Sequence, residues 1–351
     1  MTVQSISINN RLIGYNRPVY IIAELSANHN QDFEQAVQLI KAAKEAGADA
    51  IKLQTYTPDT ITINCDNKYF FIGKGSIWEG KNLYSLYQEA YTPWEWQPKL
   101  KEIANDLGMD LFSTPFDKTA VDFLQTMDVP AYKIASFEIV DLPLIQYVAS
   151  AGKPMIISTG MATLAEIDEA VTAARQAGCR EIVLLKCTSG YPALPEEMNL
   201  RTIPHMVWAF NVPVGLSDHT LGIAAAVTAV ALGACIVEKH FTLSRAVPGP
   251  DSAFSLEPHE FKAMVDAIRI AEKALGNVSY AVTKHEAASR IFRRSLFVVK
   301  DMKAGELFTP DNVRSIRPGN GMAPKYLDEV MGRRAIRDIV AGTPLSRDLL
   351  G

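Results

Sequence analysis

The sequence has few cysteines, and none of them are paired in sequence. Only four of its 351 residues are cysteine, namely Cys65, Cys179, Cys187 and Cys235, and no two form a CxxC pair. A disulfide framework or a zinc knuckle needs cysteines at characteristic spacings, which these lack. We therefore expect reduced, buried thiols.

A long apolar run is also missing. The longest one, residues 222–235, is rich in alanine and too short to cross the roughly 30 Å hydrocarbon core of a bilayer. The N-terminal residues MTVQSISINNRLIG are polar and contain no apolar segment typical of a secretory signal. We therefore expect a soluble, cytoplasmic protein with no membrane partner.

Neither sign of charge dominates the chain. It contains 35 Lys and Arg against 39 Asp and Glu, which gives a formal net charge of −4. This balance argues against a nucleic-acid partner, because such proteins carry a marked basic excess. Hydrophobic residues make up 48% of the sequence, which is enough for a substantial core. The length suits two domains, or one large barrel with an appendage.

Short β-branched runs alternate with amphipathic helical runs from residue 19 to residue 275. The predicted strands are 19–25, 50–54, 110–113, 131–135, 154–158, 181–186, 212–216 and 235–239. Eight such units over about 260 residues predict an α/β fold of the (β/α)8 TIM-barrel type. The rival fold, a doubly wound sheet, has a glycine-rich turn after its first strand. Here that turn is SANHN and contains no GxGxxG motif.

The pattern changes near residue 280. We predict a TIM-barrel catalytic domain over residues 1–280, a polar linker over 281–293 and a small, mostly β domain over 294–351. Two similar segments of the last region, VVKDMKAGELFTPDNV and AIRDIVAGTPLSRDLL, each resemble a β-hairpin-like unit with an Ala-Gly turn. A domain of this size is only marginally stable alone. We expect it to pack on a barrel, either its own or a partner's.

The connection over residues 55–92 is unusually long and rich in aromatic residues and glycine. In a TIM barrel, a loop that follows a strand lies over the active-site face. Phe70, Phe71, Ile77 and Trp78 are therefore candidates for lining a pocket. The alternative is that they only anchor the loop to the barrel.

Polar residues occur at the C-terminal ends of the predicted strands, where TIM barrels place their active sites. Three lysines on separate strands, Lys52, Lys133 and Lys186, lie there with Glu24, Gln54 and several hydroxyl residues. A single lysine in such a place is more often solvated or salt-bridged, but three in equivalent places favour a functional site. Ammonium groups and hydroxyls together suit phosphate and carboxylate groups. We therefore expect a small anionic substrate.

Two histidines, His219 and His240, follow the last two predicted strands, which are neighbours in a barrel. Imidazoles on adjacent strand ends can chelate a divalent metal, and two protein ligands make an exchangeable site. Such a site favours Mn²⁺ or Mg²⁺ over a structural zinc ion. A divalent cation is therefore the predicted cofactor, with Co²⁺ as a further candidate.

Eight motifs support a family resemblance. In chain order they are IIAELSANHN, IKLQTY, LFSTPFD, AYKIAS, PMIISTGM, GLSDHT, EKHFT and RPGNGM. Together they resemble the sialic acid synthase family, and RPGNGM lies in a region similar to that family's antifreeze-like (SAF) domain. Three stretches resemble the pseudaminic acid synthases more than the N-acetylneuraminate synthases: AELSANHN, GSIWEGKNLYSLYQEAYTPWEW and KCTSGYP.

The resemblance implies a condensation reaction. C3 of phosphoenolpyruvate adds to the open-chain aldehyde of an amino sugar, water adds at C2, and phosphate leaves by C–O cleavage. In pseudaminic acid synthases the sugar is 2,4-diacetamido-2,4,6-trideoxy-L-altrose, and the product serves bacterial surface glycans or flagellin. Three alternatives stay open: an N-acetylneuraminate or legionaminate synthase, a metal-dependent pyruvate aldolase, and a non-enzymatic carbohydrate-binding protein.

The resemblance also implies individual roles. The residues that match the phosphoenolpyruvate site are Lys52, Thr114, Lys133, Ser136, Ser158, Ser217 and Ser189, the last in place of the family's Asn. His219 and His240 match the metal ligands, and Glu24 matches the base that activates water. The residues that match contacts to the amino sugar are Tyr191, Glu238, Asp251 and Arg317. In the family, the arginine reaches the sugar's N-acetyl group from the partner chain of a domain-swapped homodimer.

Overall fold

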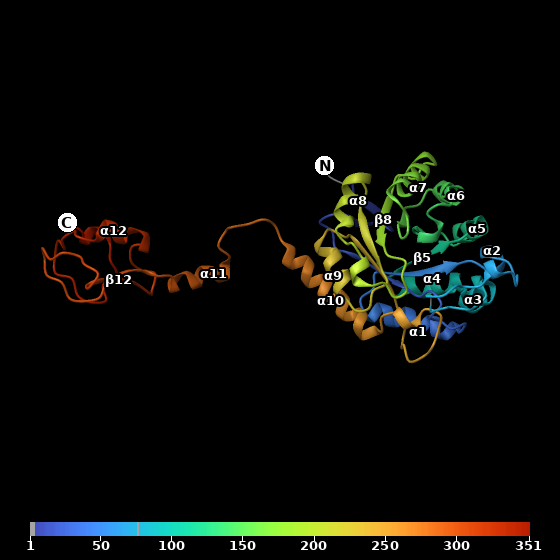
Figure 1. The fold of residues 1–351 in the computed structure, drawn as a ribbon, viewed down its shortest axis with the longest axis horizontal. Helices are drawn as coiled ribbons and strands as arrows, with labels where there is room; N and C mark the ends of the chain where they lie inside the picture. Colours follow the sequence, from blue (N-terminus) through green and yellow to red (C-terminus); the bar gives the residue numbers. More distant parts are fainter. Residues whose placement is uncertain (1–3, 76) are drawn as a thin grey trace. The chain divides into compact units, whose positions relative to one another are not determined.

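In the computed structural model, which describes residues 4–75 and 77–351, eight parallel strands close into a barrel (Figure 1). In order around the barrel they are β3 (Tyr20–Glu24), β4 (Ala50–Thr55), β5 (Asp110–Pro115), β6 (Tyr132–Ile134), β7 (Met155–Ser158), β8 (Ile182–Cys187), β9 (Val214–Asp218) and β10 (Ile236–His240). Strand β10 pairs with β3 and closes the ring. The predicted TIM barrel is confirmed, and each predicted strand overlaps one of these.

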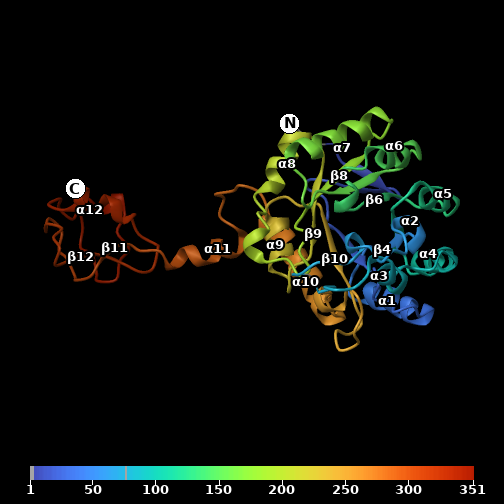
Figure 2. The same cartoon turned by 45° about the vertical axis from the view of Figure 1, so that its right-hand side comes forward.

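An outer ring of helices surrounds the strands (Figure 2). These helices are α1 (Phe33–Glu45), α4 (Gln97–Asp106), α5 (Lys118–Thr126), α6 (Leu142–Ser150), α7 (Leu164–Gln176), α8 (Thr202–Phe210), α9 (Ala224–Ala231) and α10 (Pro258–Leu275). Helix α1 illustrates why they form. Asp32 caps its N-terminus by accepting from the backbone N–H groups of Glu34 and Gln35, and the apolar side chains of Leu39 and Ile40 are buried.

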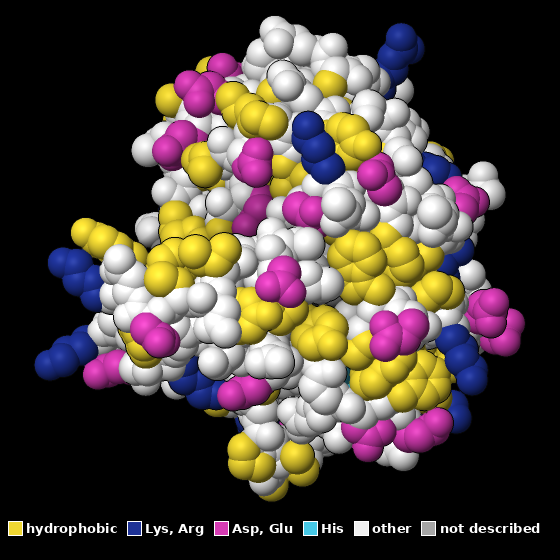
Figure 3. All heavy atoms as spheres, turned by 90° about the vertical axis from the view of Figure 1, so that its right-hand side faces the viewer, with side chains coloured by type: hydrophobic (Ala, Val, Ile, Leu, Met, Phe, Trp, Pro, Cys, Tyr) yellow, Lys and Arg dark blue, Asp and Glu magenta, His cyan; other side chains and the backbone are white. Residues whose placement is uncertain are grey.

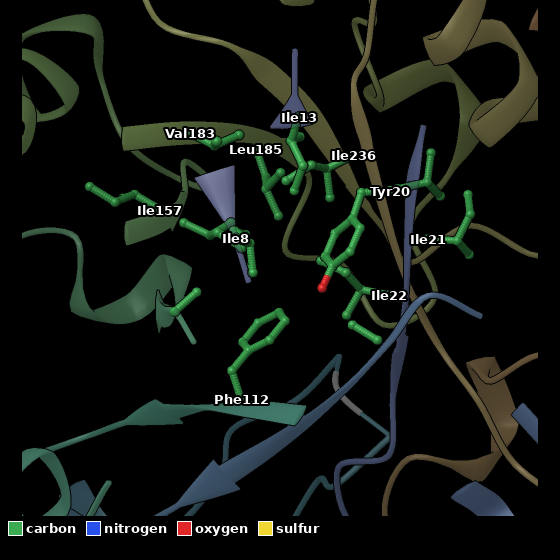
Figure 4. Close-up of a cluster of buried hydrophobic side chains, with 14 of the residues drawn as sticks. Ile8, Ile13, Tyr20, Ile21, Ile22, Phe112, Ile157, Val183, Leu185 and Ile236 are labelled. Carbon is green, nitrogen blue, oxygen red and sulfur yellow. The ribbon is translucent and has the colours of Figure 1, made fainter. Parts of the chain in front are cut away.

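A short hairpin closes the N-terminal end of the barrel. It consists of β1 (Ile6–Ile8) and β2 (Arg11–Ile13), which pair antiparallel. Ile8 and Ile13 are fully buried among barrel residues that include Tyr20 and Phe112 (Figure 4). Their burial shows that this hairpin completes the barrel core, a role that was not predicted from the sequence.

The long connection after β4 has structure of its own. It contains α2 (Pro58–Ile61), the 3-10 turn η1 (Lys68–Phe70) and α3 (Leu83–Ala90). An antiparallel bridge joins Phe71 to Asn82. The expectation of a plain loop was therefore incomplete, because Leu86 of α3 is buried and anchors the segment.

The chain divides into two compact units, and the second runs from Asn277 to Gly351. Its elements are α11 (Lys284–Ser289), the 3-10 turn η6 (Arg290–Phe292), β11 (Ser295–Val298), β12 (Val313–Ile316) and α12 (Leu327–Val330). Strands β11 and β12 pair antiparallel over a small core of their own, as expected for a small β domain. The segment predicted as a linker contains α11 and η6.

The two similar segments of the second unit bind each other. Met302 and Ile339 exchange two backbone hydrogen bonds of 2.8 and 2.9 Å. The carboxylates of Asp301 and Asp338 each accept from a backbone N–H in the opposite segment, at 2.7 and 2.8 Å. The two ends of each segment also pair antiparallel with each other, Val298 with Val313 and Ala335 with Leu350. The prediction that each segment is a hairpin-like unit is therefore confirmed, and the two units interlock.

No helix within the described residues is long and apolar enough to cross a membrane. On the face drawn in Figure 3, acidic, basic and hydrophobic side chains are interspersed. This mixture agrees with the balanced charge of the sequence.

Candidate active site

Strand register brings the predicted site residues to the inside of the barrel's C-terminal end. Glu24 of β3 pairs with Lys52 of β4 on one side and with His240 of β10 on the other. Glu238 of β10 pairs with Ser217 of β9. Neighbouring residues in register face the same side of a sheet, so these polar groups form a ring inside the mouth of the barrel.

Glu24 is a fully buried member of this ring. Its Oε2 lies 2.8 Å from Nζ of Lys52, and its Oε1 accepts a hydrogen bond of 3.0 Å from Nε2 of Gln54. Burial raises the pKa of Glu24 to about 6, although the charge of Lys52 acts in the opposite direction. A carboxyl group with this pKa can exchange a proton near neutral pH.

Lys52 connects Glu24 to side chains of two further strands, β10 and β5. Its Nζ lies 3.6 Å from Oε1 of Glu238 and 3.4 Å from Oγ1 of Thr114. Burial opposes its positive charge, but the carboxylates of Glu238 and Glu24 outweigh burial and raise the pKa of Lys52. Ser217 donates a 3.1 Å hydrogen bond to the same Oε1 of Glu238.

Lys133 is a second buried ammonium group in this mouth. Its Nζ donates to Oγ of Ser158 at 2.6 Å and to the carbonyl of Ile134 at 2.9 Å. Its pKa is lowered by burial, since no carboxylate forms an ion pair with it among the described residues. An anionic ligand beside Lys133 would therefore be favoured.

Ser136 and Ser189 converge over the backbone of Gly160. The amide of Gly160 donates to Oγ of Ser136 at 3.1 Å. A Cβ atom at Gly160 would lie only 2.2 Å from Oγ of Ser189 and 2.7 Å from Oγ of Ser136. Glycine is therefore required here for two hydroxyls to approach one backbone segment, an arrangement that suits binding of an oxyanion.

The two predicted metal ligands lie side by side. The ring centroids of His219 and His240 are 5.3 Å apart. Nδ1 of His219 lies 3.0 Å from the carbonyl oxygen of Thr188, a contact that leaves Nε2 as a free acceptor when Nδ1 carries the proton. Nδ1 of His240 is buried and has no hydrogen-bond partner among the described residues.

These properties fit a divalent cation held by two histidines. Burial lowers the pKa of His240 well below its usual value, so this imidazole is neutral, as a metal ligand must be. Within residues 4–75 and 77–351, no cluster of three or more His, Cys, Asp or Glu side chains forms a metal site. The arrangement therefore fits an exchangeable ion with open coordination positions better than a structural zinc ion.

An aromatic wall adjoins the histidines. The ring of Tyr191 lies 4.5 Å from that of His219, and the ring of Phe254 lies 4.9 Å from that of His240, centroid to centroid. Trp78, at the tip of the long connection, lies 5.6 Å from Tyr191. Its indole Nε1 donates to the carbonyl of Pro250 at 2.8 Å, which fixes the tip to the segment after β10.

A cleft of about 810 Å³ lies beside Trp78, between the long connection and the segment after β10. Its lining includes Asn30, Trp78, Arg245 and Ser252. Asp251, on the same segment, accepts a short hydrogen bond from Ser26, which also accepts from Gln54 at 3.1 Å. Because Gln54 also donates to Glu24, hydrogen bonds connect the segment that borders the cleft to Glu24.

One predicted residue on the barrel strands faces away from the mouth. Lys186 pairs in register with Leu216, so it faces outward, and its Nζ donates to the carbonyl of Cys187 and to Thr188. Its inclusion with the other two lysines was wrong, because the predicted strand was counted one residue out of phase. Arg317 lies in the second unit, where its side chain is exposed.

Two groups in the mouth were not predicted from the sequence. Cys187, rather than Lys186, faces inward, and its Sγ lies 3.9 Å from Nδ1 of His219. Burial opposes its ionisation, but the hydrogen bond with His219 lowers its pKa to about 7. The inward alternation Val183, Leu185, Cys187 along β8 would have identified it.

Glu138 is the second missed group. It follows β6 in the turn that carries Ser136, and its Oε2 is buried and has no hydrogen-bond partner among the described residues. Burial raises its pKa to about 7, with Lys133 acting in the opposite direction. Periodicity gives no signal for a residue in such a turn.

A TIM barrel whose C-terminal mouth gathers buried lysines, hydroxyls and an imidazole pair belongs to the class of barrel enzymes that act on small anions. Sequence comparison names the family: residues 39–280 match the NeuB family and residues 293–350 match the SAF domain. The chain therefore belongs to the NeuB family and is an enzyme, which confirms the resemblance drawn from the motifs.

Individual relatives agree with this assignment. The chain is 48% identical to a pseudaminic acid synthase of Campylobacter jejuni, over 95% of this chain and 96% of the relative. It is 38% identical to an N,N'-diacetyllegionaminic acid synthase of Legionella pneumophila, over 95% and 94%. The solved structure of the spore coat polysaccharide biosynthesis protein SpsE of Bacillus subtilis aligns with a TM-score of 0.68 at 36% identity and covers 99% of each chain.

Proposed function

We propose that this enzyme is a pseudaminic acid synthase, which condenses phosphoenolpyruvate with 2,4-diacetamido-2,4,6-trideoxy-L-altrose and water to give pseudaminic acid and phosphate. The observation that carries the proposal is the pairing of Lys52 and Lys133 with hydroxyls in one mouth, directly beside His219 and His240. This arrangement provides an anion site next to a site for a polarised aldehyde. Use of the product in surface glycans or flagellin, and a cytoplasmic location, are part of the proposal.

The phosphoenolpyruvate site consists of two lysines and a set of hydroxyls. Lys133 and Ser158 are already hydrogen-bonded to each other, and Ser136 and Ser189 converge on Gly160. The remaining members of the set are Lys52, Gln54, Thr114 and Ser217. Fixed donors of this kind hold the phosphate and carboxylate of the substrate and stabilise charge as C3 attacks the aldehyde.

Glu24 is the proposed base for the water that adds at C2. Its carboxylate is buried, is hydrogen-bonded to Gln54, and has a pKa of about 6, so it is ionised at neutral pH and can accept a proton. Lys52, 2.8 Å away, stabilises the ionised form. Glu24 accepts a proton from water as the water oxygen bonds to C2. The C–O bond to phosphate then breaks as the new C2 hydroxyl loses its proton and becomes the ketone.

His219 and His240 are the proposed ligands of a divalent cation, Mn²⁺, Mg²⁺ or Co²⁺. When bound, such a cation supplies Lewis-acid polarisation of the sugar's aldehyde. The residues around it orient the sugar: the ring of Tyr191 lies beside that of His219, and Glu238 and Asp251 offer carboxylates that can accept hydrogen bonds from hydroxyl or amide groups.

The choice of sugar rests on the relatives and on Trp78. Identity to the Campylobacter jejuni pseudaminic acid synthase, at 48%, exceeds identity to the legionaminic acid synthase, at 38%. Trp78, Tyr191 and Phe254 offer apolar surface next to the imidazoles, which suits the methyl groups of a 6-deoxy diacetamido sugar. The second candidate function is an N-acetylneuraminate or legionaminate synthase.

Phosphate release from phosphoenolpyruvate with a panel of sugars tests this proposal. The diacetamido-trideoxy-altrose should give the highest kcat/KM and a product with the mass of pseudaminic acid. A higher kcat/KM with N-acetylmannosamine would replace the proposal with the second candidate. Condensation with pyruvate instead of phosphoenolpyruvate would indicate an aldolase, and binding of sugar without turnover would indicate a carbohydrate-binding protein.

The proposed homodimer rests on an exposed apolar rim around the mouth. Five successive loops, after β6 to β10, each carry a large apolar side chain that is at least 50% exposed. These residues are Phe137, Met161, Leu194, Leu221 and Val247. Exposed apolar groups gathered around a site usually mark an interface. We assign this rim to the small unit of a second copy, whose exposed Arg317 would then reach the sugar.

A further inference from the structure

A fully buried ion pair lies just outside the mouth, between the strands and the helical layer. Nζ of Lys239 lies 2.7 Å from Oδ2 of Asp218, and both side chains are 0% exposed. The two residues pair in register on β10 and β9. Their neighbours in register, Glu238 and Ser217, contact each other inside the barrel, so the ion pair faces outward.

Further hydrogen bonds tie the pair to the turn after β9. Oδ1 of Asp218 accepts from the backbone N–H of Thr220 at 2.9 Å and from its hydroxyl at 2.8 Å. Lys239 also donates to the carbonyl of Thr220. The pair therefore joins the end of β10 to both the end of β9 and the turn that follows it.

Each charged residue directly precedes one of the two histidines. Asp218 precedes His219, and Lys239 precedes His240, so the ion pair fixes the backbone from which both imidazoles project. The ring of His240 depends on this most, because its Nδ1 has no hydrogen-bond partner among the described residues. His219, by contrast, is also held through Thr188.

Stability alone does not account for such a pair. Removing two charges from water costs several kcal/mol per ion, and apolar residues of similar volume are often equally stable. We propose that Asp218 and Lys239 are positioning residues that hold His219 and His240 at the separation a divalent cation requires, and so set the affinity of the metal site. The inference rests on the metal site of the proposed function.

The test replaces the ion pair without leaving a buried charge. In Asp218→Asn/Lys239→Met, the Asn oxygen can still accept from Thr220, and Met fills the volume of the lysine stem. We expect the Kd for Mn²⁺, measured from the electron paramagnetic resonance of free Mn²⁺, to rise about 10–100-fold, as for other residues that orient metal ligands. Turnover should recover towards the wild-type value when Mn²⁺ is saturating.

Tyr20→Phe is the matched control. It removes a 2.6 Å hydrogen bond to Asp110 at the opposite end of the barrel, so it should lower the melting temperature without changing the Kd for Mn²⁺. An unchanged Kd in the double variant would overturn the inference and leave the pair a structural feature. If the double variant does not fold, the Kd for Mn²⁺ is measured for Asp218→Asn alone, which is nearly isosteric. An unchanged Kd in that variant would likewise overturn the inference.

The wild-type measurement separates this inference from the proposed function. If wild-type protein binds Mn²⁺ and His240→Ala does not, the metal site is established, and the double variant then decides the inference. If the wild-type protein binds no divalent cation, the proposed metal site fails and the inference fails with it.

Discussion

The two ends of the barrel are both polar, but only one end satisfies its polar groups internally. At the N-terminal end, Tyr20 donates to Asp110 at 2.6 Å, and Arg11 lies 2.5 Å from Asp49. Arg269 pairs with the second oxygen of Asp49 at 3.2 Å. These groups have their partners within the chain, and together with the β1–β2 hairpin they close the barrel.

The C-terminal end leaves buried polar atoms without partners. Within the described part of the chain, such atoms include Asn28 Oδ1, Glu138 Oε2, Glu238 Oε2 and His240 Nδ1, and all four lie at this end. An unsatisfied buried polar atom costs roughly 1–3 kcal/mol. The difference between the ends indicates that the N-terminal end serves stability, whereas the C-terminal end is the ligand-binding end.

The largest expected effect comes from removing either imidazole at the C-terminal end. His219→Ala and His240→Ala should each lower kcat/KM by roughly 10³-fold or more, because Lewis-acid stabilisation contributes several kcal/mol to the transition state. EDTA should have the same effect on the wild-type enzyme, reversed by Mn²⁺, Co²⁺ or Mg²⁺. Full activity in a metal-free, folded His240→Ala protein would refute the metal assignment.

A somewhat smaller loss is expected for Glu24→Gln, which removes the proposed base but keeps a hydrogen-bonding side chain. We expect a loss of roughly 10²–10⁴-fold in kcat/KM. The base must be ionised, so wild-type kcat/KM should fall as the pH drops through about 6, the pKa of Glu24. Measured pH profiles should show this acidic limb in the wild type but not in Glu24→Gln. Glu272→Gln, a control at the N-terminal end where Glu272 accepts from the backbone N–H of Val19, should keep it.

Mixing two inactive full-length variants tests whether a second copy completes the mouth. A Glu24→Ala chain and an Arg317→Ala chain are each expected to be nearly inactive. Random pairing of equal amounts should restore about one quarter of all sites, because half of the dimers are then mixed and one of the two mouths in each mixed dimer has both groups intact. No recovery in dimers shown to be mixed would mean that each small unit serves its own barrel.

A fewfold effect is expected at the tip of the long connection. Trp78→Ala removes apolar surface beside Tyr191, so it should lower kcat/KM for the diacetamido sugar more than for N-acetylmannosamine. One buried methyl contributes about 0.8 kcal/mol. The KM for phosphoenolpyruvate should change little, and Tyr69→Ala, at a residue 75% exposed on the same connection, should affect neither sugar. Equal losses on both sugars would make Trp78 a scaffold residue.

The smallest effect on activity is expected at the N-terminal end. Tyr20→Phe removes one hydrogen bond from a satisfied network and should lower the free energy of unfolding by about 1–2 kcal/mol, since Asp110 loses a partner. Thermal unfolding measures the loss of stability, and steady-state kinetics measure the effect on activity, which should be small. A large loss of kcat in a folded Tyr20→Phe protein would contradict the division of roles between the ends.

Much of the barrel follows from the sequence because its strands and helices have strong periodicities. Periodicity does not fix the residue at which each strand ends. Lys186 was therefore assigned to the wrong face, since a shift of one residue reverses the face on which a strand residue lies. The β1–β2 hairpin was missed because its strands have only three residues each, and the first residues are mostly polar.

Only the site residues at strand ends or within family motifs could be predicted from the sequence. Register brings together Glu24, Lys52 and His240, as the barrel predicts. The unpaired oxygen of Glu138 and the outward pair of Asp218 and Lys239 depend on turns and on packing against the helical layer. Such contacts arise from tertiary structure, which periodicity does not encode.

The most direct measurement follows the bridging oxygen of phosphoenolpyruvate. The enzyme, supplied with Mn²⁺ and the diacetamido sugar, is incubated with phosphoenolpyruvate that carries ¹⁸O between C2 and phosphorus. Attack of water at C2, assisted by Glu24, predicts that the label leaves with phosphate and that the nine-carbon keto acid is unlabelled. Label retained in the keto acid would mean that the P–O bond breaks instead, and would contradict the proposed chemistry of the C-terminal mouth.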